Sequence, residues 1–270
     1  MEVMIRGAVY HIDVKGEGRP VLFLHGFTGD SSAWGSIIHK LSQSVMCIAI
    51  DLPGHGKTVM PRNDLSRFSM KEVCRDLGFI LEYLNVKSAD VLGYSMGGRT
   101  ALSFAAFYPD KVRKLILESA SPGLESIVES EARKKQDDQL AQFILNEGIA
   151  AFVDRWENIP LFETQKNLDA EVQENLHAKR MQNKPEHLAA SLQGMGTGRQ
   201  PSWWGELNKI KHETLLITGE KDRKFCQIAK NMADQMPNAK KVEIPETGHA
   251  IHVEQPEKFG TIIEEFLESD

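Results

Sequence analysis

Residues 89–106 read ADVLGYSMGGRTALSFAA, and they predict a strand, a tight turn and a helix in direct succession. Ser95 stands in the turn, two residues after Gly93 and two before Gly97. A serine between two glycines at such a strand-to-helix turn is typical of a nucleophile elbow. The turn imposes strained dihedral angles on the serine, and the glycines let neighbouring backbone segments come close. We therefore predict that the Ser95 hydroxyl projects from a sheet, above a helix N-terminus whose dipole favours negative charge.

Short apolar runs alternate with amphipathic ones on both sides of this turn. The runs that we expect to form strands are 19–24, 45–50, 89–92, 112–118, 214–219 and 241–245, with helices at 70–84 and after Pro256. Continuous apolar runs indicate parallel strands that are buried on both faces. Their alternation with helices predicts an α/β fold with a mostly parallel, doubly wound sheet.

The strand pattern is interrupted between residues 123 and 211. Only helical stretches are expected there, at 125–148, 150–156 and 168–182. We therefore divide the chain into an α/β core, residues 1–122 and 212–270, and an inserted helical cap, residues 123–211. Such an insertion is expected to cover the carboxyl ends of the strands, where ligands bind to sheets of this kind.

Charge and cysteine usage narrow the class of protein. With 32 basic and 38 acidic residues the net charge is −6, which argues against a nucleic-acid-binding surface. The N-terminus lacks the pattern of a signal peptide, and no apolar run has membrane-spanning length, so we expect no membrane insertion. Cys47, Cys74 and Cys226 have no metal-ligand spacing, and we interpret them as reduced thiols of a cytoplasmic protein. Oligomeric state cannot be derived from these features.

A serine hydroxyl becomes a base or nucleophile only beside an imidazole that a carboxylate orients. Asp222 and His249 each follow an apolar strand downstream of Ser95, and they are the expected partners. Asp222 is also suited to cap the helix that follows it. The sequence leaves two alternatives open, Glu118 as the acid and His252 as the histidine. His249 is favoured because a glycine precedes it and permits close loop packing.

Backbone amides are expected to stabilise negative charge that develops on a substrate oxygen. The amide of Met96, directly after the serine, and that of Phe27, in the loop after the strand 19–24, are the candidates for this oxyanion hole. His25 precedes that loop and is interpreted as holding it through hydrogen bonds to the backbone. We assign a structural role to the turn-forming loop 51–56 as well.

The elbow, the His25-Gly26 loop and the Gly248-His249 ending together resemble the α/β-hydrolase superfamily over essentially the whole chain. Three further segments are similar to one family within it, the 2-succinyl-6-hydroxy-2,4-cyclohexadiene-1-carboxylate synthases. They are SASPGL at 119–124, WENIPLF at 156–162 and MGTGRQPSWW at 195–204. The resemblance implies a lyase of menaquinone biosynthesis that uses neither cofactor nor metal. It would remove pyruvate from 2-succinyl-5-enolpyruvyl-6-hydroxy-3-cyclohexene-1-carboxylate.

This small-molecule substrate carries three carboxylates, so its pocket should hold fixed cations. Arg99 lies four residues after Ser95, on the same side of the predicted helix, and a guanidinium can bind a carboxylate through two hydrogen bonds. It could instead pair with an acid of the protein. The resemblance adds four candidate substrate-binding residues, each of which could also be a solvated or packing residue: Tyr94, Arg133, Trp156 and Arg180.

The resemblance also implies that Ser95 acts as a base rather than as an acyl-forming nucleophile. His249, oriented by Asp222, would take the serine proton, and the serine oxygen would then remove a ring proton. Two other functions remain open. The same residues could serve a carboxylic-ester or carbon–carbon bond hydrolase, and the fold could also carry a ligand receptor that hydrolyses little.

Overall fold

The computed structural model describes residues 1–61 and 64–269. Within them the strands form one eight-stranded sheet in the order β1-β2-β4-β3-β5-β6-β7-β8. These strands are β1 (Glu2–Ile5), β2 (Ala8–Lys15), β3 (Arg19–Leu24), β4 (Val45–Ile50), β5 (Ala89–Tyr94), β6 (Val112–Glu118), β7 (Glu213–Gly219) and β8 (Ala239–Ile244). Strands β3 to β8 are parallel, which confirms the mostly parallel sheet. The antiparallel hairpin β1–β2, which joins β4, lies outside the strands predicted from the sequence.

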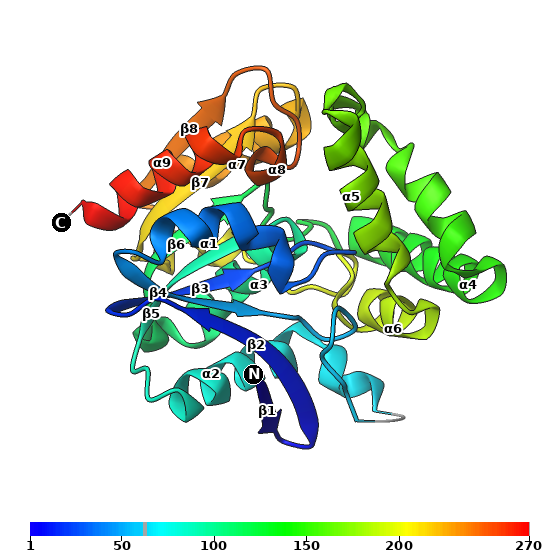
Figure 1. Cartoon of the computed structure of the whole chain (residues 1–270), viewed down its shortest axis with the longest axis horizontal. Coiled ribbons are helices and arrows are strands. Elements are labelled where there is room, and N and C mark those ends of the chain that lie inside the picture. Colours follow the sequence, from blue (N-terminus) through cyan, green and yellow to red (C-terminus); the bar gives the residue numbers. More distant parts are fainter. Residues whose placement is uncertain (62–63, 270) are drawn as a thin grey trace.

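Helices cover both faces of the sheet (Figure 1). One face is covered by α1 (Gly35–Leu41) and α9 (Pro256–Glu268), and the other by α2 (Met70–Tyr83), α3 (Met96–Phe107) and α7 (Arg223–Ala233). Neighbouring residues of β3 show why its sequence is continuously apolar. Leu22 packs into the core on the α2–α3 side, while Phe23 packs into the core on the α1–α9 side. The doubly wound α/β fold is thereby confirmed.

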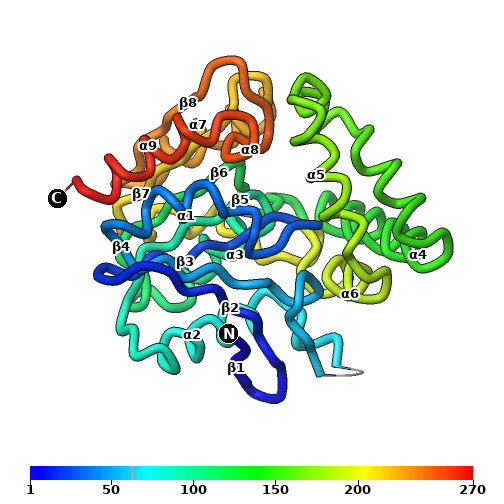
Figure 2. Tube along the Cα trace, in the orientation of Figure 1, coloured from blue at the N-terminus to red at the C-terminus, as the bar shows by residue number. Residues whose placement is uncertain are grey.

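Three helices lie together beyond the carboxyl ends of the parallel strands, at the right of Figures 1 and 2. They are α4 (Ile127–Glu157), α5 (Ala170–Met181) and α6 (Pro185–Met195). Helix α4 changes direction at Gly148, where φ is 80°. This break lies between the two helical stretches expected there. Phe152 of α4 and Leu188 of α6 belong to a small apolar core that these helices share. A 3₁₀ segment, η4 (Pro160–Asn167), connects α4 to α5.

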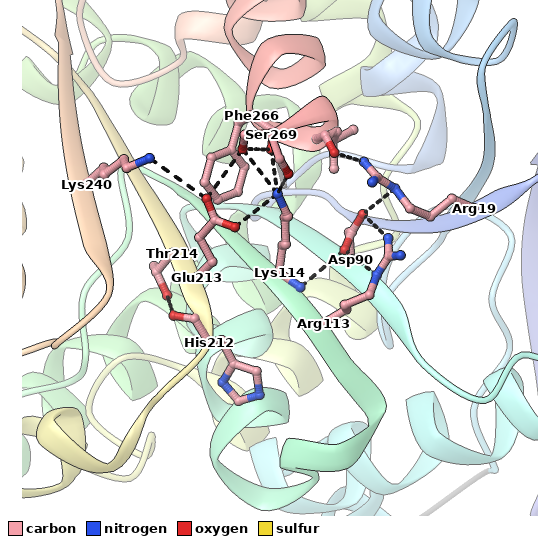
Figure 3. Close-up of polar contacts among 11 residues, drawn as sticks. Arg19, Asp90, Arg113, Lys114, His212, Glu213, Thr214, Lys240, Phe266 and Ser269 are labelled. Atoms are coloured by element: carbon pink, nitrogen blue, oxygen red, sulfur yellow. Dashed lines mark hydrogen bonds and ion pairs between the residues drawn. The ribbon is translucent and has the colours of Figure 1, made fainter.

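A network of charged side chains ties the amino ends of the strands to the end of α9 (Figure 3). Asp90 of β5 is fully buried, and Arg113 donates to both of its carboxylate oxygens at 3.0 and 2.6 Å. Arg19 Nε lies 3.2 Å from the same carboxylate and its guanidinium also reaches the Leu267 carbonyl. Lys114 binds the Phe266 carbonyl at 3.0 Å. This edge of the sheet is opposite to the edge where the strands approach the cap helices.

We expect Asp90→Asn to destabilise the protein without changing the structure at the opposite edge of the sheet, where the strands approach the cap helices. The substitution removes the charge that two guanidinium groups share at a buried position, so we expect a loss of about 2–4 kcal/mol in the free energy of unfolding. Urea unfolding followed by tryptophan fluorescence measures this change. Asp110→Asn, at an exposed position, is the matched control and should change stability by less than about 0.5 kcal/mol. Equal midpoints for the two variants would contradict the prediction.

Candidate active site

Ser95 lies between β5 and α3 with φ 50° and ψ −106°, the strained backbone expected of a nucleophile elbow. Its amide donates to the carbonyl of Glu118 on the neighbouring strand β6 at 2.9 Å. A Cβ atom on Gly97 would collide with the backbone carbonyl of Leu24, which explains why glycine stands two residues after the serine. The turn directs the serine side chain toward the region covered by the cap helices.

The structure brings Ser95, His249 and Asp222 together. His249 Nε2 lies 2.9 Å from Ser95 Oγ, and its Nδ1 lies 2.6 Å from Asp222 Oδ2. Asp222 also caps α7, since its Oδ1 accepts from the Phe225 amide at 3.4 Å. The imidazole is only 1% exposed. With Nδ1 facing the carboxylate, Nε2 is free to accept the serine proton, so the arrangement can generate a basic oxygen at Ser95.

The two alternatives, Glu118 and His252, bind each other instead. His252 Nδ1 lies 2.9 Å from both carboxylate oxygens of Glu118, and neither side chain hydrogen-bonds to the Ser95–His249 pair.

A glycine before His249 does allow close packing, because a Cβ on Gly248 would collide with the Thr164 side chain of η4. Glu254 accepts from the Gly248 amide at 2.7 Å and from the Thr164 hydroxyl at 2.9 Å.

The amides of Phe27 and Met96 stand where an oxyanion could be bound. Met96 is the first residue of α3, so its amide has no partner within the helix. Neither this amide nor that of Phe27 donates to an acceptor among residues 1–61 and 64–269. Both residues line the same cavity as Ser95 and His249. The two donors are therefore available to a substrate oxygen.

His25 holds the Phe27 loop through the backbone, as expected. Its Nε2 accepts from the Leu52 amide at 2.9 Å, and its Nδ1 lies 2.8 Å from the Gly26 carbonyl. The ring of His55 packs edge-on against the rings of His25 and Phe27 at 5.1 and 5.5 Å. Both imidazoles are buried, and burial lowers the pKa of His25 and lowers that of His55 well below 6.5.

Because the pKa values of His25 and His55 are lowered, we expect the protein to lose stability in mild acid. At these two positions the unfolded chain binds protons near pH 6.5, whereas the native chain binds them only at lower pH, so the free energy of unfolding falls as the pH drops below 6.5. Each group contributes at most about 1.4 kcal/mol per pH unit. His55→Gln should make this fall shallower in urea titrations between pH 7.5 and 5, whereas the exposed His39→Gln serves as the control. If the free energy of unfolding depended on pH with the same slope in both variants, the buried His55 would not be a source of the acid destabilisation.

A cavity of about 230 Å³ opens between the elbow and the cap helices. Ser95, His249, Arg99, Arg133 and Trp156 all line it, together with Tyr94. Trp156 stacks on Phe152 and meets the ring of Phe27 edge-on at 5.4 Å, and its buried indole N–H has no hydrogen-bond partner in the described residues. Burial and then the Glu118 carboxylate raise the pKa of Tyr94 well above 10.0, so its hydroxyl is a donor at neutral pH.

Arg99 is a buried cation that binds only neutral groups. It is 9% exposed, and its Nη1 donates to the Met195 carbonyl at 3.0 Å and to Gln200 Oε1 at 2.9 Å. In the described part of the chain no carboxylate lies within ion-pair distance of it, which argues against the alternative of a protein acid as its partner. Burial, and next the charge of Arg133, lower its pKa to about 10. An anionic ligand in the cavity would relieve this cost.

The other two arginines are placed differently. Arg133 is 41% exposed and pairs with Asp137 at 2.7 Å while it lines the cavity of Ser95. Arg180 does not reach that cavity. It lines a second cavity of about 330 Å³ beneath α5, where it pairs with Glu157 at 3.0 Å and binds Gln165 at 2.8 Å. Sequence spacing could not predict this, because the contacts join residues from three separate cap segments.

Two contacts of the site were not predicted from the sequence. Gln200 orients Arg99 and in turn donates to the Ser121 carbonyl at 3.2 Å. Phe225 packs edge-on against His249 with 4.6 Å between the ring centroids. Phe225 stands three residues after Asp222, a spacing that places it at the helix start beside the acid, whereas no local pattern distinguishes Gln200.

The fold and the Ser95–His249–Asp222 geometry define a protein of the α/β-hydrolase class, and residues 19–256 match the family model described as alpha/beta hydrolase fold. A Bacillus subtilis (strain 168) protein named putative 2-succinyl-6-hydroxy-2,4-cyclohexadiene-1-carboxylate synthase is 44% identical over 249 residues, which are 92% of this chain and 90% of that protein. This chain belongs to the 2-succinyl-6-hydroxy-2,4-cyclohexadiene-1-carboxylate synthase family, a family of enzymes, and the predicted resemblance is confirmed.

Solved structures agree with this relationship. MenH from S. aureus superimposes with a TM-score of 0.91 at 38% identity, covering 96% of this chain and 97% of that one. A thermophilic esterase from Thermogutta terrifontis, in a malate-bound structure, has a TM-score of 0.85 at 27% identity and covers 99% of this chain and 98% of its own. The same fold thus occurs in MenH and in an esterase, over nearly the whole of each chain.

Two further findings concern the described residues alone. Within residues 1–61 and 64–269, no three His, Cys, Asp or Glu side chains gather in a way that could hold a metal ion. None of the helices in that part of the chain has both the length and the apolar character needed to cross a membrane.

Proposed function

We propose that this chain eliminates pyruvate from 2-succinyl-5-enolpyruvyl-6-hydroxy-3-cyclohexene-1-carboxylate and releases 2-succinyl-6-hydroxy-2,4-cyclohexadiene-1-carboxylate. The observation that carries the proposal is Arg99, a buried guanidinium without an acidic partner in the described residues, in the same cavity as Ser95. A small substrate with several carboxylates would satisfy such a cation. The names of the relatives point to the same reaction.

In the proposed mechanism, Ser95 is the base. His249, oriented by Asp222, takes the hydroxyl proton, and the Ser95 oxygen removes the proton at C2 of the ring. The electrons of the C2–H bond first form an enolate with the succinyl carbonyl, whose oxygen the Phe27 and Met96 amides stabilise. Its collapse forms the C2=C3 bond, moves the C3=C4 pair to C4=C5 and breaks the bond from C5 to oxygen. The enolpyruvate that leaves takes up a proton and becomes pyruvate.

Substrate binding is proposed to depend on the cap, residues 123–211. Arg99 and Arg133 bind carboxylates, while Tyr94 and Trp156 offer a hydroxyl and an indole N–H to the same ligand. Glu157 and Gln165 hold the Arg180 guanidinium outside the Ser95 cavity. Arg180 can therefore bind substrate only if the cap segment η4, which contains Gln165, rearranges. We therefore propose that Arg180 binds substrate only after the cap has rearranged.

Incubation with the enolpyruvyl substrate tests the function. We expect one equivalent of pyruvate, measured with a coupled dehydrogenase, together with the absorbance of a conjugated diene. The Ser95→Ala protein, shown to be folded by circular dichroism, is the control for uncatalysed loss of pyruvate. If folded wild-type protein released neither product above that control, the lyase proposal would be wrong.

An ester hydrolase is the second candidate, because the Thermogutta terrifontis esterase has the same fold over nearly the whole chain. A Ser-His-Asp triad with two free amides can also attack an ester carbonyl. Turnover of p-nitrophenyl acetate measures this activity directly. Rates on this neutral ester that match those on the anionic ring would favour the hydrolase, whereas we expect the ring substrate to be strongly preferred because the cavity contains buried Arg99.

A further inference from the structure

Glu118 is a fully buried acid that the proposed mechanism does not use. It is the last residue of β6, directly beside Tyr94 in the register of the sheet. Its Oε1 accepts from the His252 amide at 3.0 Å, and both carboxylate oxygens lie 2.9 Å from His252 Nδ1. Burying a carboxylate is costly, and these contacts recover part of that cost. Such a costly group calls for an explanation.

The same residue also holds the nucleophile elbow. Its backbone carbonyl accepts the 2.9 Å hydrogen bond from the Ser95 amide. One residue therefore contacts two loops at once, the Ser95 turn through its main chain and the segment after His249 through its side chain. His249 and His252 are three residues apart, and the short helix α8 (Ile251–Glu254) contains the second of them.

The surroundings of His252 leave its ring little freedom. Its centroid lies 4.7 Å from the Trp34 ring, 4.6 Å from that of Tyr94 and 6.2 Å from that of Phe259. Tyr94 in turn lies 5.4 Å from His249 and directly precedes Ser95. A shift of the His252 ring would therefore move Tyr94, and with it the backbone of the elbow.

We infer that Glu118 is a positioning residue, which acts through His252 to hold the histidine loop and the nucleophile elbow at the distance that joins His249 Nε2 to Ser95 Oγ. The inference rests on the triad of the proposed function, but on no particular substrate. A displacement of about 1 Å between reacting groups can reduce a rate about a hundredfold. Holding two loops from a single rigid strand end limits such displacement.

The test measures the reactivity of Ser95 without the natural substrate. A fluorophosphonate forms a bond between phosphorus and Ser95 Oγ and loses fluoride, while the hydroxyl proton passes to His249 Nε2, so the rate depends on the Ser95–His249 contact. We expect Glu118→Ala to lower the second-order rate constant of this reaction by about tenfold to a hundredfold. Glu118→Gln, which still accepts from the His252 amide, should fall between Glu118→Ala and the wild type. In steady-state assays, kcat should fall while KM changes little.

Glu213→Gln is the matched control, since it loses a 3.0 Å ion pair with Lys114 (Figure 3). Glu213 is the first residue of β7, at the amino ends of the strands, whereas Ser95 follows the carboxyl end of β5. It should react at the wild-type rate. Should Glu118→Ala not fold, as judged by urea unfolding, Glu118→Gln and His252→Asn provide the measurement. His252→Asn keeps a side-chain donor toward Glu118 but loses the ring, so it should also slow the reaction.

Several results would overturn the inference. Folded Glu118→Gln and His252→Asn proteins that both react within twofold of the wild type would show that the pair stabilises the fold only. An equal slowing in Glu213→Gln would mean that any loss of stability lowers the rate. A wild-type protein that is not phosphonylated would have no assembled pair to position. If wild type releases no pyruvate yet reacts at Ser95, the lyase proposal fails and the positioning role is still decided by the variants.

Discussion

Ser95→Ala is expected to lower kcat/KM for the enolpyruvyl substrate by about three to four orders of magnitude. The reason is that the serine oxygen, 2.9 Å from His249 Nε2, is the only group that the proposed mechanism uses to remove the ring proton, and general base catalysis contributes about 10²–10⁴-fold. Pyruvate release measured under subsaturating substrate gives the value directly. The substrate should still bind, because the arginines of the cavity are unchanged.

Two companion proteins make this measurement decisive. His249→Ala should be impaired to a similar degree, and the double variant little further, because residues that act as one unit have non-additive effects. Ser103→Ala, on the same helix α3 but hydrogen-bonded to Trp203, is the matched control and should retain activity. If Ser95→Ala kept more than about a tenth of the wild-type activity, Ser95 would not be the base.

Local turn chemistry explains why so much of the site could be predicted from the sequence. A serine between glycines, an acid after one strand and a histidine after another each follow from the backbone that the fold requires at a strand end. Because the strands are parallel, these three ends meet at one edge of the sheet, where the structure places them. The role of each residue in catalysis stays a prediction until the variants are measured.

Features that depend on tertiary contacts were harder to predict. Arg180 is held by Glu157 and Gln165, which lie on other cap segments. No periodic pattern in the sequence relates these two residues to Arg180. The hairpin β1–β2 has the alternating burial of a one-sided strand at its start, a weaker signal than the continuous runs of β3 to β7. Helix α6 was not among the predicted helices, although it begins at Pro185, a typical first helical residue, and buries Leu188, Leu192 and Met195.

Arg99→Ala is expected to lower kcat/KM for the anionic substrate by about two to three orders of magnitude, the effect of losing a charge-assisted pair at a desolvated position. Arg99→Lys should recover only part of this loss, because an ammonium group cannot bind a carboxylate through the paired hydrogen bonds of a guanidinium. Arg155→Ala removes the same charge from the exposed end of α4 and is the matched control.

Stability separates a binding role for Arg99 from a structural one. Its guanidinium is buried and binds only the Met195 carbonyl and Gln200, so the native protein bears a desolvation cost. Within the described residues no ion pair compensates for it, and the charge of Asp137 is a smaller effect on its pKa than burial. Arg99→Ala should therefore leave the urea midpoint unchanged or raise it, even as activity on the anionic ring falls. Hydrolysis of a neutral ester by Ser95, if any is detectable, should fall much less. A loss of stability combined with less than a threefold change in kcat/KM would instead identify Arg99 as a structural residue of the elbow helix.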